Sequence, residues 1–204
     1  MKPVLLSLAI ALLMVGWGEV VDYEKLQDRG GVMYLPNEET PFTGRAESFH
    51  ENGQKSDEIN FKDGKWDGLR TAWYPNGQKY LSCNYEDGKT TSFTRWYENG
   101  QKSTEGFDYS RNQHKEISWY KNGQKSSEVI YRDGKPDKPI SAKVWKPNGE
   151  KCTLTNLKDG NGIKASYSDD RTWQSFYSTY KDGKIVGYQD LQTGERRIGP
   201  TPKG

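Results

Sequence analysis

The 204-residue chain has 30 basic and 28 acidic side chains, a net charge of +2 that excludes the strong basic patch of a nucleic-acid binder. Only 32% of its residues are hydrophobic, too few for a thick globular core, but 13% are aromatic, which argues against disorder. This composition fits a thin structure in which aromatic rings shield one layer of backbone.

The first eighteen residues, MKPVLLSLAIALLMVGWG, differ from the rest of the chain. Lys2 precedes an apolar run from Val4 to Val15 that only Ser7 interrupts. Such a run is too short to span a bilayer comfortably, but it suits a signal-peptide hydrophobic region of about 7–15 residues. We predict a signal peptide over residues 1–18, cleaved before Glu19, with an uncleaved membrane anchor as the alternative.

The end of this segment, Met14-Val15-Gly16-Trp17, resembles a bacterial lipobox. Trp17 stands where the lipidated cysteine would be, and without a thiol lipid anchoring is not possible. We therefore expect an exported protein, in the periplasm, cell envelope or extracellular space, that contacts a membrane only through an uncleaved leader.

After a lead-in segment, residues 19–41, short turn motifs recur at near-constant intervals over residues 42–190. Asn-Gly-Gln-Lys begins at four positions and Asn-Gly-Glu-Lys at a fifth, 23 to 26 residues apart. Eleven residues after most of these asparagines comes Asp-Gly, which Ser110 interrupts in the third copy. A fixed period of this length indicates tandem repeats. The residues predicted to form the turns are Asn52, Gly53, Asp63, Gly64, Asn76, Gly77, Asp87, Gly88, Asn99, Gly100, Asn122, Gly123, Asp133, Gly134, Asn148 and Gly149.

Asn-Gly and Asp-Gly flanked by alternating apolar residues are the strongest short-range signals for β-hairpins. Each repeat therefore reads as two strands, for example residues 54–61 and 69–74, and leaves little room for a helix. We predict an all-β fold, an elongated single-layer antiparallel meander of eleven or twelve strands, followed by a polar tail over residues 191–204.

Aligning the copies on their asparagine reveals two aromatic columns. Tryptophan stands three residues before the asparagine in four copies and tyrosine two residues before it in three, with His50 and Lys146 in the tyrosine column of the first and fifth copies. The candidate interaction stripe consists of Trp73, Tyr74, Trp96, Tyr97, Trp119, Tyr120 and Trp145. Its alternative role is to support a sheet that lacks a second layer, and the two roles are compatible.

The face that carries the tryptophans depends on the Asn-Gly loop. A two-residue loop would place Tyr74 with Leu81, Cys83 and Tyr85. A three-residue loop with a glycine bulge would instead group Trp73 with Leu69 and those three residues, and we expect it because it collects the apolar side chains on one face. In the third copy the aromatic residues are out of phase, so we expect a bulge, a slipped register or a longer loop there.

Basic residues follow the asparagines at a fixed distance and form a second row. The row consists of Lys55, Lys79, Lys102, Lys125 and Lys151. These lysines are either solvated turn residues or a surface that docks to an acidic partner.

The repeated unit, WYxNGQKxxExxxxDGK, resembles the MORN repeat variant found in tandem in bacterial proteins, many of them named as YwqK-type antitoxins. The resemblance covers residues 42–190 and rests on the Trp-Tyr pairs with the Asn-Gly and Asp-Gly turns. It implies an elongated sheet of hairpins with a role in protein interaction or membrane-associated scaffolding, and it implies no catalytic residues.

Residues suited to catalysis or metal binding are scarce. The two histidines have structural explanations, because His50 stands in the tyrosine column and His114 in the degenerate third turn, where we expect it to be exposed. Cys83 and Cys152 lie three repeats apart, too far to form a disulfide. We predict no catalytic residues, no cofactor and no metal site.

Together these patterns predict a non-enzymatic exported repeat protein that acts as a protein-interaction or scaffold module in the cell envelope. Its partner would be a protein, with an envelope or wall glycan as a second option and no nucleic acid. The alternative functions are a YwqK-type antitoxin-like partner protein and an aromatic-repeat binder of wall carbohydrate or choline.

Overall fold

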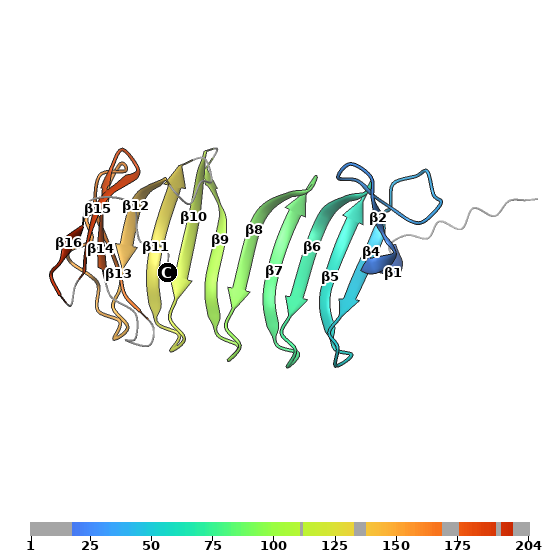
Figure 1. The fold of residues 1–204 in the computed structure, drawn as a ribbon, viewed down its shortest axis with the longest axis horizontal. Coiled ribbons are helices and arrows are strands. Elements are labelled where there is room, and N and C mark those ends of the chain that lie inside the picture. The colour runs from blue at the N-terminus through green and yellow to red at the C-terminus, as the bar shows by residue number, and fades with distance from the viewer. Residues whose placement is uncertain (1–17, 111, 133–137, 169–175, 191–192, 198–204) are drawn as a thin grey trace, which may run out of the picture.

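The computed structural model describes residues 18–204 except 111, 133–137, 169–175, 191–192 and 198–204. The predicted leader, all but its last residue, lies outside the described residues, as do Asp133-Gly134 and most of the predicted tail. In the described part, strands follow one another along the long axis of the molecule, and the only helical element is a single 3-10 turn, Tyr23–Lys25 (Figure 1).

A ten-stranded sheet forms the body of the protein, in the spatial order β1-β4-β5-β6-β7-β8-β9-β10-β11-β12. Its strands are β1 (Glu19–Asp22), β4 (Gly44–Phe49), β5 (Lys55–Lys62), β6 (Lys65–Trp73), β7 (Lys79–Glu86), β8 (Lys89–Trp96), β9 (Lys102–Ser110), β10 (Gln113–Trp119), β11 (Lys125–Arg132) and β12 (Pro139–Val144). Each pair of consecutive strands from β4 to β12 is antiparallel, which confirms the predicted meander of hairpins.

Two features depart from a single continuous meander. Strand β1, in the lead-in segment, pairs in parallel with β4 and forms the edge of the sheet. After β12 the chain starts a separate four-stranded sheet of β13 (Gly162–Ser166), β14 (Phe176–Lys181), β15 (Lys184–Asp190) and β16 (Arg196–Arg197), and a third, small sheet pairs β2 (Gln27–Asp28) with β3 (Met33–Tyr34). The prediction of one sheet over the whole repeat region is therefore wrong beyond β12.

The Asn-Gly turns have the predicted three-residue loop with a glycine bulge. In the loop between β6 and β7 the amide of Gly77 donates to the carbonyl of Tyr74, and the amide of Tyr74 donates to the carbonyl of Gln78. Gly77 has a φ of 82°. The same pair of hydrogen bonds recurs at each of the five Asn-Gly or equivalent turns of the sheet.

The Asp-Gly turns are the two-residue loops that their sequence predicts. Asp63 and Gly64 have φ values of 50° and 76°, the positive pair of a type I′ turn, and Lys62 pairs directly with Lys65 across it. Asp87-Gly88 has the same form. In the third copy, where Ser110 interrupts the motif, the register shifts between Gln113 and His114, as expected.

A further β-bulge next to each Asn-Gly turn overturns the predicted grouping of side chains. Trp73 pairs with Lys79, but Ala72 pairs with Leu81, so Tyr80 has no partner of its own on β6. Residues paired in register share a face, so Leu81 lies with Ala72 on the face opposite to Trp73. Cys83 and Tyr85 pair with Arg70 and Gly68 and share that opposite face. Of the four expected neighbours, only Leu69 shares a face with Trp73.

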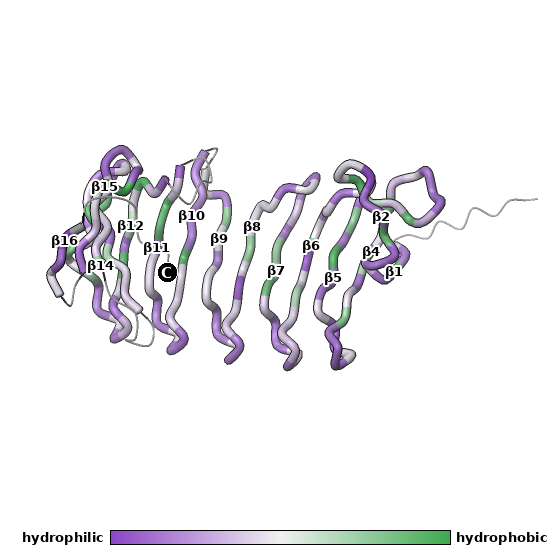
Figure 2. Tube along the Cα trace, viewed as in Figure 1, coloured by the Kyte–Doolittle hydropathy of each residue, from purple (hydrophilic) through white to green (hydrophobic). Residues whose placement is uncertain are grey.

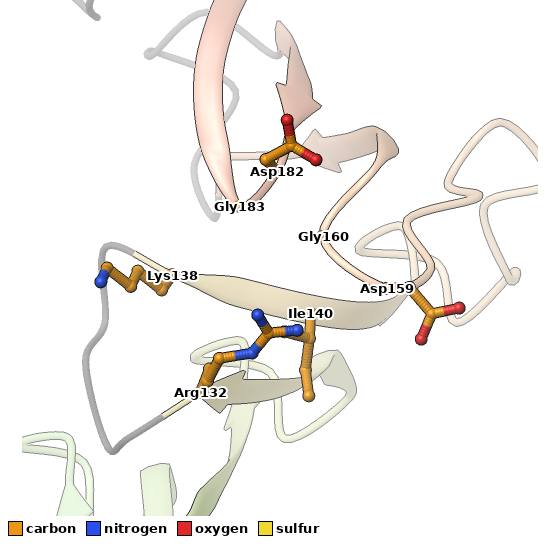
Figure 3. Close-up of a pocket in the computed structure, with 7 residues that line it drawn as sticks. All are labelled: Arg132, Lys138, Ile140, Asp159, Gly160, Asp182 and Gly183. Atoms are coloured by element: carbon orange, nitrogen blue, oxygen red, sulfur yellow. The ribbon is translucent and has the colours of Figure 1, made fainter.

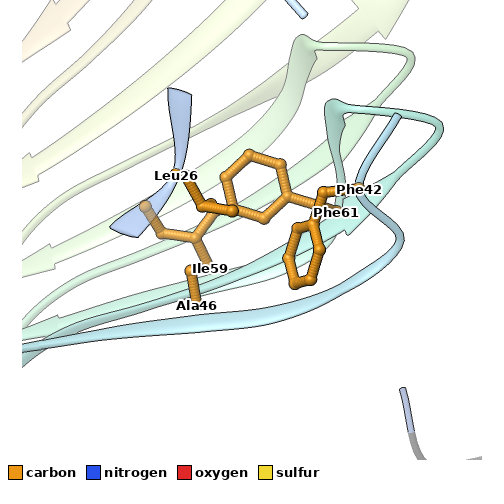
Figure 4. Packing of buried hydrophobic residues seen from close by; sticks show 5 residues of the cluster. All are labelled: Leu26, Phe42, Ala46, Ile59 and Phe61. Atoms are coloured by element: carbon orange, nitrogen blue, oxygen red, sulfur yellow. The ribbon is translucent and has the colours of Figure 1, made fainter. Parts of the chain in front are cut away.

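Buried hydrophobic residues form three separate clusters instead of one core. The lead-in segment covers the first strands, where Leu26 packs on Phe42, Ala46, Ile59 and Phe61 (Figure 4). A second cluster contains Ala72, Leu81 and Cys83, and a third contains Val144, Cys152 and Ala165. Hydrophobic segments accordingly recur on β5, β7, β10 and β11 (Figure 2). Both cysteines are free and lie in different clusters, as predicted.

Candidate interaction surface

The four tryptophans before the Asn-Gly turns end β6, β8 and β10 or directly follow β12, and all lie on one face of the ten-stranded sheet. They are Trp73, Trp96, Trp119 and Trp145, and Phe49 ends β4 at the equivalent position. The tryptophans are half-buried and Phe49 is 55% exposed. We call this side of the sheet the tryptophan face. Its rings recur at every second strand, a spacing of about 9–10 Å.

Lysines of the predicted basic row alternate with the tryptophan rings. The Nζ of Lys55 lies 5.8 Å from the ring centre of Trp73, in the next repeat. Lys102 and Lys125 are placed in the same way, 5.6 Å from the ring of Trp119 and 5.3 Å from that of Trp145. Each lysine therefore links its own turn to the aromatic ring of the following repeat through a cation–π contact.

The same lysines form ion pairs with glutamates three residues further along the strand. Lys55 contacts Glu58 at 2.7 Å and Lys125 contacts Glu128 at 2.6 Å. Side chains three residues apart point to opposite faces of a regular strand. The β-bulge beside each Asn-Gly turn adds one residue and brings both side chains to the tryptophan face. Lys102 and Glu105 form the third pair, at 2.8 Å.

The first and last of these pairs belong to larger charge networks near the ends of the face. Glu47 and Glu58 hold Arg45 and Lys55 on β4 and β5. Near the other end, Glu128 contacts three lysines, Lys115, Lys125 and Lys143. Hydrogen bonding from Lys125 lowers the pKa of Glu128, and the charges of the three lysines act in the same direction.

The second repeat lacks the ion pair. Its lysine, Lys79, is exposed and forms no ion pair with any described residue, because Ser82 stands where the first, third and fourth copies have glutamate. Ser82 pairs with Thr71 on β6 and with Thr94 on β8, so three hydroxyl side chains lie side by side there.

The tyrosines of the predicted stripe do not share this surface. Each is adjacent in the chain to its tryptophan, and its hydroxyl is used inside the molecule. Tyr74 donates to the carbonyl of Trp96 at 2.8 Å, Tyr97 to that of Trp119 at 2.8 Å, and Tyr120 to that of Trp145 at 2.7 Å. The predicted stripe thus separates into a row of rings on one face and a row of ties between repeats.

The contact made by His50 confirms the predicted structural role of this residue in the tyrosine column. Its Nε2 lies 2.8 Å from the carbonyl oxygen of Trp73, the bond that the tyrosine hydroxyl makes in the next three copies. His114 is not exposed as expected, but half-buried: its ring stacks on Phe93 with centroids 6.0 Å apart, because the shifted register turns it onto the sheet.

The Asn-Gly turns are bonded to one another by side chains that sequence reasoning assigned only to local turn formation. The Nδ2 of Asn52 donates to the carbonyl of Pro75, and Asn99 and Asn122 donate to the carbonyls of Lys121 and Pro147. The glutamine that follows Asn-Gly makes a further contact between turns: the side chain of Gln101 lies against Gly123 of the next turn. The recurrence of this glutamine in the sequence was the signal that could have indicated the contact.

The cavity at the later Asp-Gly turns does not bring carboxylates together (Figure 3). This small cavity, of about 90 Å³, lies where the later Asp-Gly turns stack and is lined by Arg132, Lys138, Ile140, Asp159, Gly160, Asp182 and Gly183 (Figure 3). The carboxylates of Asp159 and Asp182 lie apart on separate turns, and the glycine amides there bond to carbonyls of the preceding turn or strand. In the described part of the chain, His, Cys, Asp and Glu form no group of three suited to a metal ion.

Titratable side chains with pKa values shifted by burial also lie outside the tryptophan face, on β11 and β13. Burial raises the pKa of Tyr131 and lowers that of Lys164, which Glu116 partly opposes. These groups lie between β10–β11 and the C-terminal sheet and pack the two sheets together.

A search of curated proteins finds no match to this chain. The family model for the MORN repeat variant matches residues 42–63 and 66–88, the segments that contain β4–β5 and β6–β7. No helix within the described ranges has the length and apolar character needed to cross a bilayer. Residues 42–88 therefore carry two MORN repeat variants, modules that generally mediate interactions with proteins or membranes.

Proposed function

We propose that this protein is a non-enzymatic scaffold that binds a protein partner through its tryptophan face. The observation that carries the proposal is the row of half-exposed tryptophans interleaved with lysines across β4 to β12. Tryptophan is among the residues that contribute most to binding energy at protein interfaces, and the lysines add attraction for an acidic partner.

The array is rigid before any partner arrives. Tyrosine hydroxyls and asparagine amides tie each turn to the next one, so adjacent tryptophans keep their spacing. A preordered surface loses little conformational entropy on binding, which favours affinity.

Choline binding has less support than protein binding. A choline-type cage needs several aromatic rings around one cation. In this sheet, the protein's own lysines already lie against the rings of Trp73, Trp119 and Trp145. No two tryptophan rings of the described residues form a ring pair.

Export to the cell envelope is part of the proposal and is supported by the composition of residues 1–18 alone. A location outside the cytoplasm also favours an envelope scaffold over an antitoxin-like role, because the partner of a cytoplasmic toxin must stay inside the cell. Fractionation of cells that express the chain with and without residues 1–18 tests this point; cytoplasmic retention of the full chain would contradict it.

The binding proposal is tested by cross-linking the purified chain in envelope extract and identifying the proteins it captures. A double variant, Trp96→Thr and Trp119→Thr, keeps residues that favour strands but removes two rings. We expect it to lose the specific partner, while a control variant at the exposed Asp-Gly edge, Glu86→Gln, retains it. Thermal melts must show that both variants are folded, and equal capture by wild type and a folded double variant would contradict the proposal.

A further inference from the structure

The second repeat offers a charge arrangement that the other hairpins of the sheet lack. In the first, third and fourth copies the lysine after Asn-Gly-Gln is neutralised by a glutamate of its own strand. In the second copy Ser82 replaces that glutamate, and Lys79 has no ion-pair partner among the described residues. The second copy therefore keeps the lysine but lacks the glutamate that would neutralise it.

The surroundings of Lys79 suit a side chain that comes from outside. Trp73 pairs directly with Lys79, and Trp96 belongs to the next strand on the same face. Below them Ser82 and Thr94 present hydroxyl groups in register. An incoming carboxylate would meet one ammonium group and hydroxyl donors between two aromatic rings.

Charge balance over the tryptophan face favours the same ligand. Four glutamates, Glu47, Glu58, Glu105 and Glu128, share six basic side chains: Arg45, Lys55, Lys102, Lys115, Lys125 and Lys143. These ion-paired groups are therefore net positive even before Lys79 is included, although the whole chain is nearly neutral. An acidic segment would therefore be attracted to the face.

We propose that Lys79 receives the carboxylate of an aspartate or glutamate from an extended acidic segment of the protein partner, placed between Trp73 and Trp96. The partner's carboxylate occupies the position that the internal glutamate has in the other copies. This inference rests on the proposed function and adds the chemistry of the partner at one repeat.

Lys151 provides a matched control. It follows the fifth turn at the same position, is exposed, and has Leu154 where the other copies have glutamate. Its strand position is opposite Trp145, but Leu154 is 56% exposed and provides no hydroxyl group beside the lysine. Replacing Lys79 or Lys151 by glutamine changes the net charge equally, so a difference between the two variants reports the local site.

The test is fluorescence anisotropy with two labelled probes, a hexaglutamate peptide and a hexaglutamine peptide, on the chain lacking residues 1–18. We expect the glutamate peptide to bind and the glutamine peptide to bind at least about tenfold more weakly. Lys79→Gln and Ser82→Glu should each weaken binding about tenfold, the second because it supplies the internal counter-ion. Ser82→Ala removes one hydroxyl donor but no charge and should weaken binding only about threefold, whereas Lys151→Gln should stay within about twofold of wild type.

Equal affinity of Lys79→Gln and Lys151→Gln would overturn the site, because it would indicate attraction by net charge alone. Binding of anionic lipid vesicles without binding of the peptide would overturn it as well. If the captured partner is lost with the Trp96→Thr and Trp119→Thr variant but kept with Ser82→Glu, the proposed function stands and this inference fails. If no partner depends on the tryptophans, the proposed function fails while the peptide result still decides the inference.

Discussion

The two long edges of the sheet are built from different turns, and they tolerate sequence change differently. The Asn-Gly edge repeats the same loop, hydrogen bonds and bulge in every described copy that belongs to the ten-stranded sheet. At the Asp-Gly edge, the strands are connected by a two-residue turn in two copies of that sheet. Between β9 and β10 the pairing register is shifted instead. Side-chain ties between repeats are more numerous at the first edge. At the second edge, neighbouring turns are joined by fewer side-chain bonds and by bonds between backbone groups.

The largest expected effect comes from the tryptophan row next to the Asn-Gly edge. Replacing Trp96 by Ala should lower the free energy of unfolding by about 3 kcal/mol, because a half-buried ring and its packing are lost. Leu69 lies on the same face, closer to the other edge, and is 45% exposed. Leu69→Ala should lower the free energy of unfolding by about 1 kcal/mol or less. Urea unfolding of both variants checks this. A loss near zero for Trp96→Ala together with lost partner capture would assign the ring to contact alone.

Glycine to alanine changes compare the edges directly. Gly123 and Gly88 both have positive φ, 81° and 77°, so alanine is strained in either turn. A Cβ on Gly123 would lie 2.7 Å from the Oε1 of Gln101, whereas a Cβ on Gly88 would meet nothing within 4 Å. We expect a destabilisation of about 2 kcal/mol for Gly123→Ala and about 1 kcal/mol for Gly88→Ala. Equal losses in chemical denaturation would show that the contact between turns adds no stability.

The tyrosine ties have a smaller expected effect. Tyr74→Phe removes the hydroxyl that donates to the carbonyl of Trp96 and should cost about 1 kcal/mol. Tyr80, whose ring packs edge-on against Tyr74 at 5.1 Å, is 42% exposed, and Tyr80→Phe serves as the matched control with a change near zero. Amide exchange at residues of β8 measures whether the loss is transmitted to the next repeat; unchanged exchange in Tyr74→Phe would contradict a role as a tie.

The smallest expected effect concerns the ion pairs. Because lysines hold the pKa of Glu128 below its ordinary value, its contribution to stability is complete above the unfolded-state pKa and is lost as the pH falls through the lower folded-state pKa. Glu128→Gln should therefore cost about 0.5–1 kcal/mol at pH 7 and nothing in strong acid. Glu86→Gln, at the Asp-Gly edge, is the control for the loss of one negative charge. An equal loss for Glu128→Gln at both pH values would rule out an ionic origin.

The sequence predicted the hairpins, the two turn types and the irregular third copy because each of these depends on residues that are neighbours in the chain. It failed on the faces, since the β-bulge at Tyr80 is not marked by glycine or by any other distinctive residue. The lead-in segment was outlined as a unit, but its parallel pairing with β4 depends on contacts between residues about 25 positions apart.

The candidate site was predicted in part for the same reason. The spacing of the tryptophans and of the lysines could be read from the sequence. That lysines and tryptophans of neighbouring repeats alternate on one face could not be predicted, because it depends on the β-bulge. The role of the tyrosines as hydroxyl donors to the following repeat could not be predicted either. Their acceptors are backbone carbonyl groups, which every residue has and which the side-chain pattern therefore does not indicate.

The ties between repeats all run in one direction, and this gives the array a head and a tail. His50, Tyr74, Tyr97 and Tyr120 each reach forward to a carbonyl of the following copy. In the fifth copy Lys146 occupies their place and turns back to Glu150 of its own loop, at 3.0 Å, beside the last strand of the long sheet. Lys146 therefore makes no tie of this kind to a following copy, at the point where β12 ends the ten-stranded sheet.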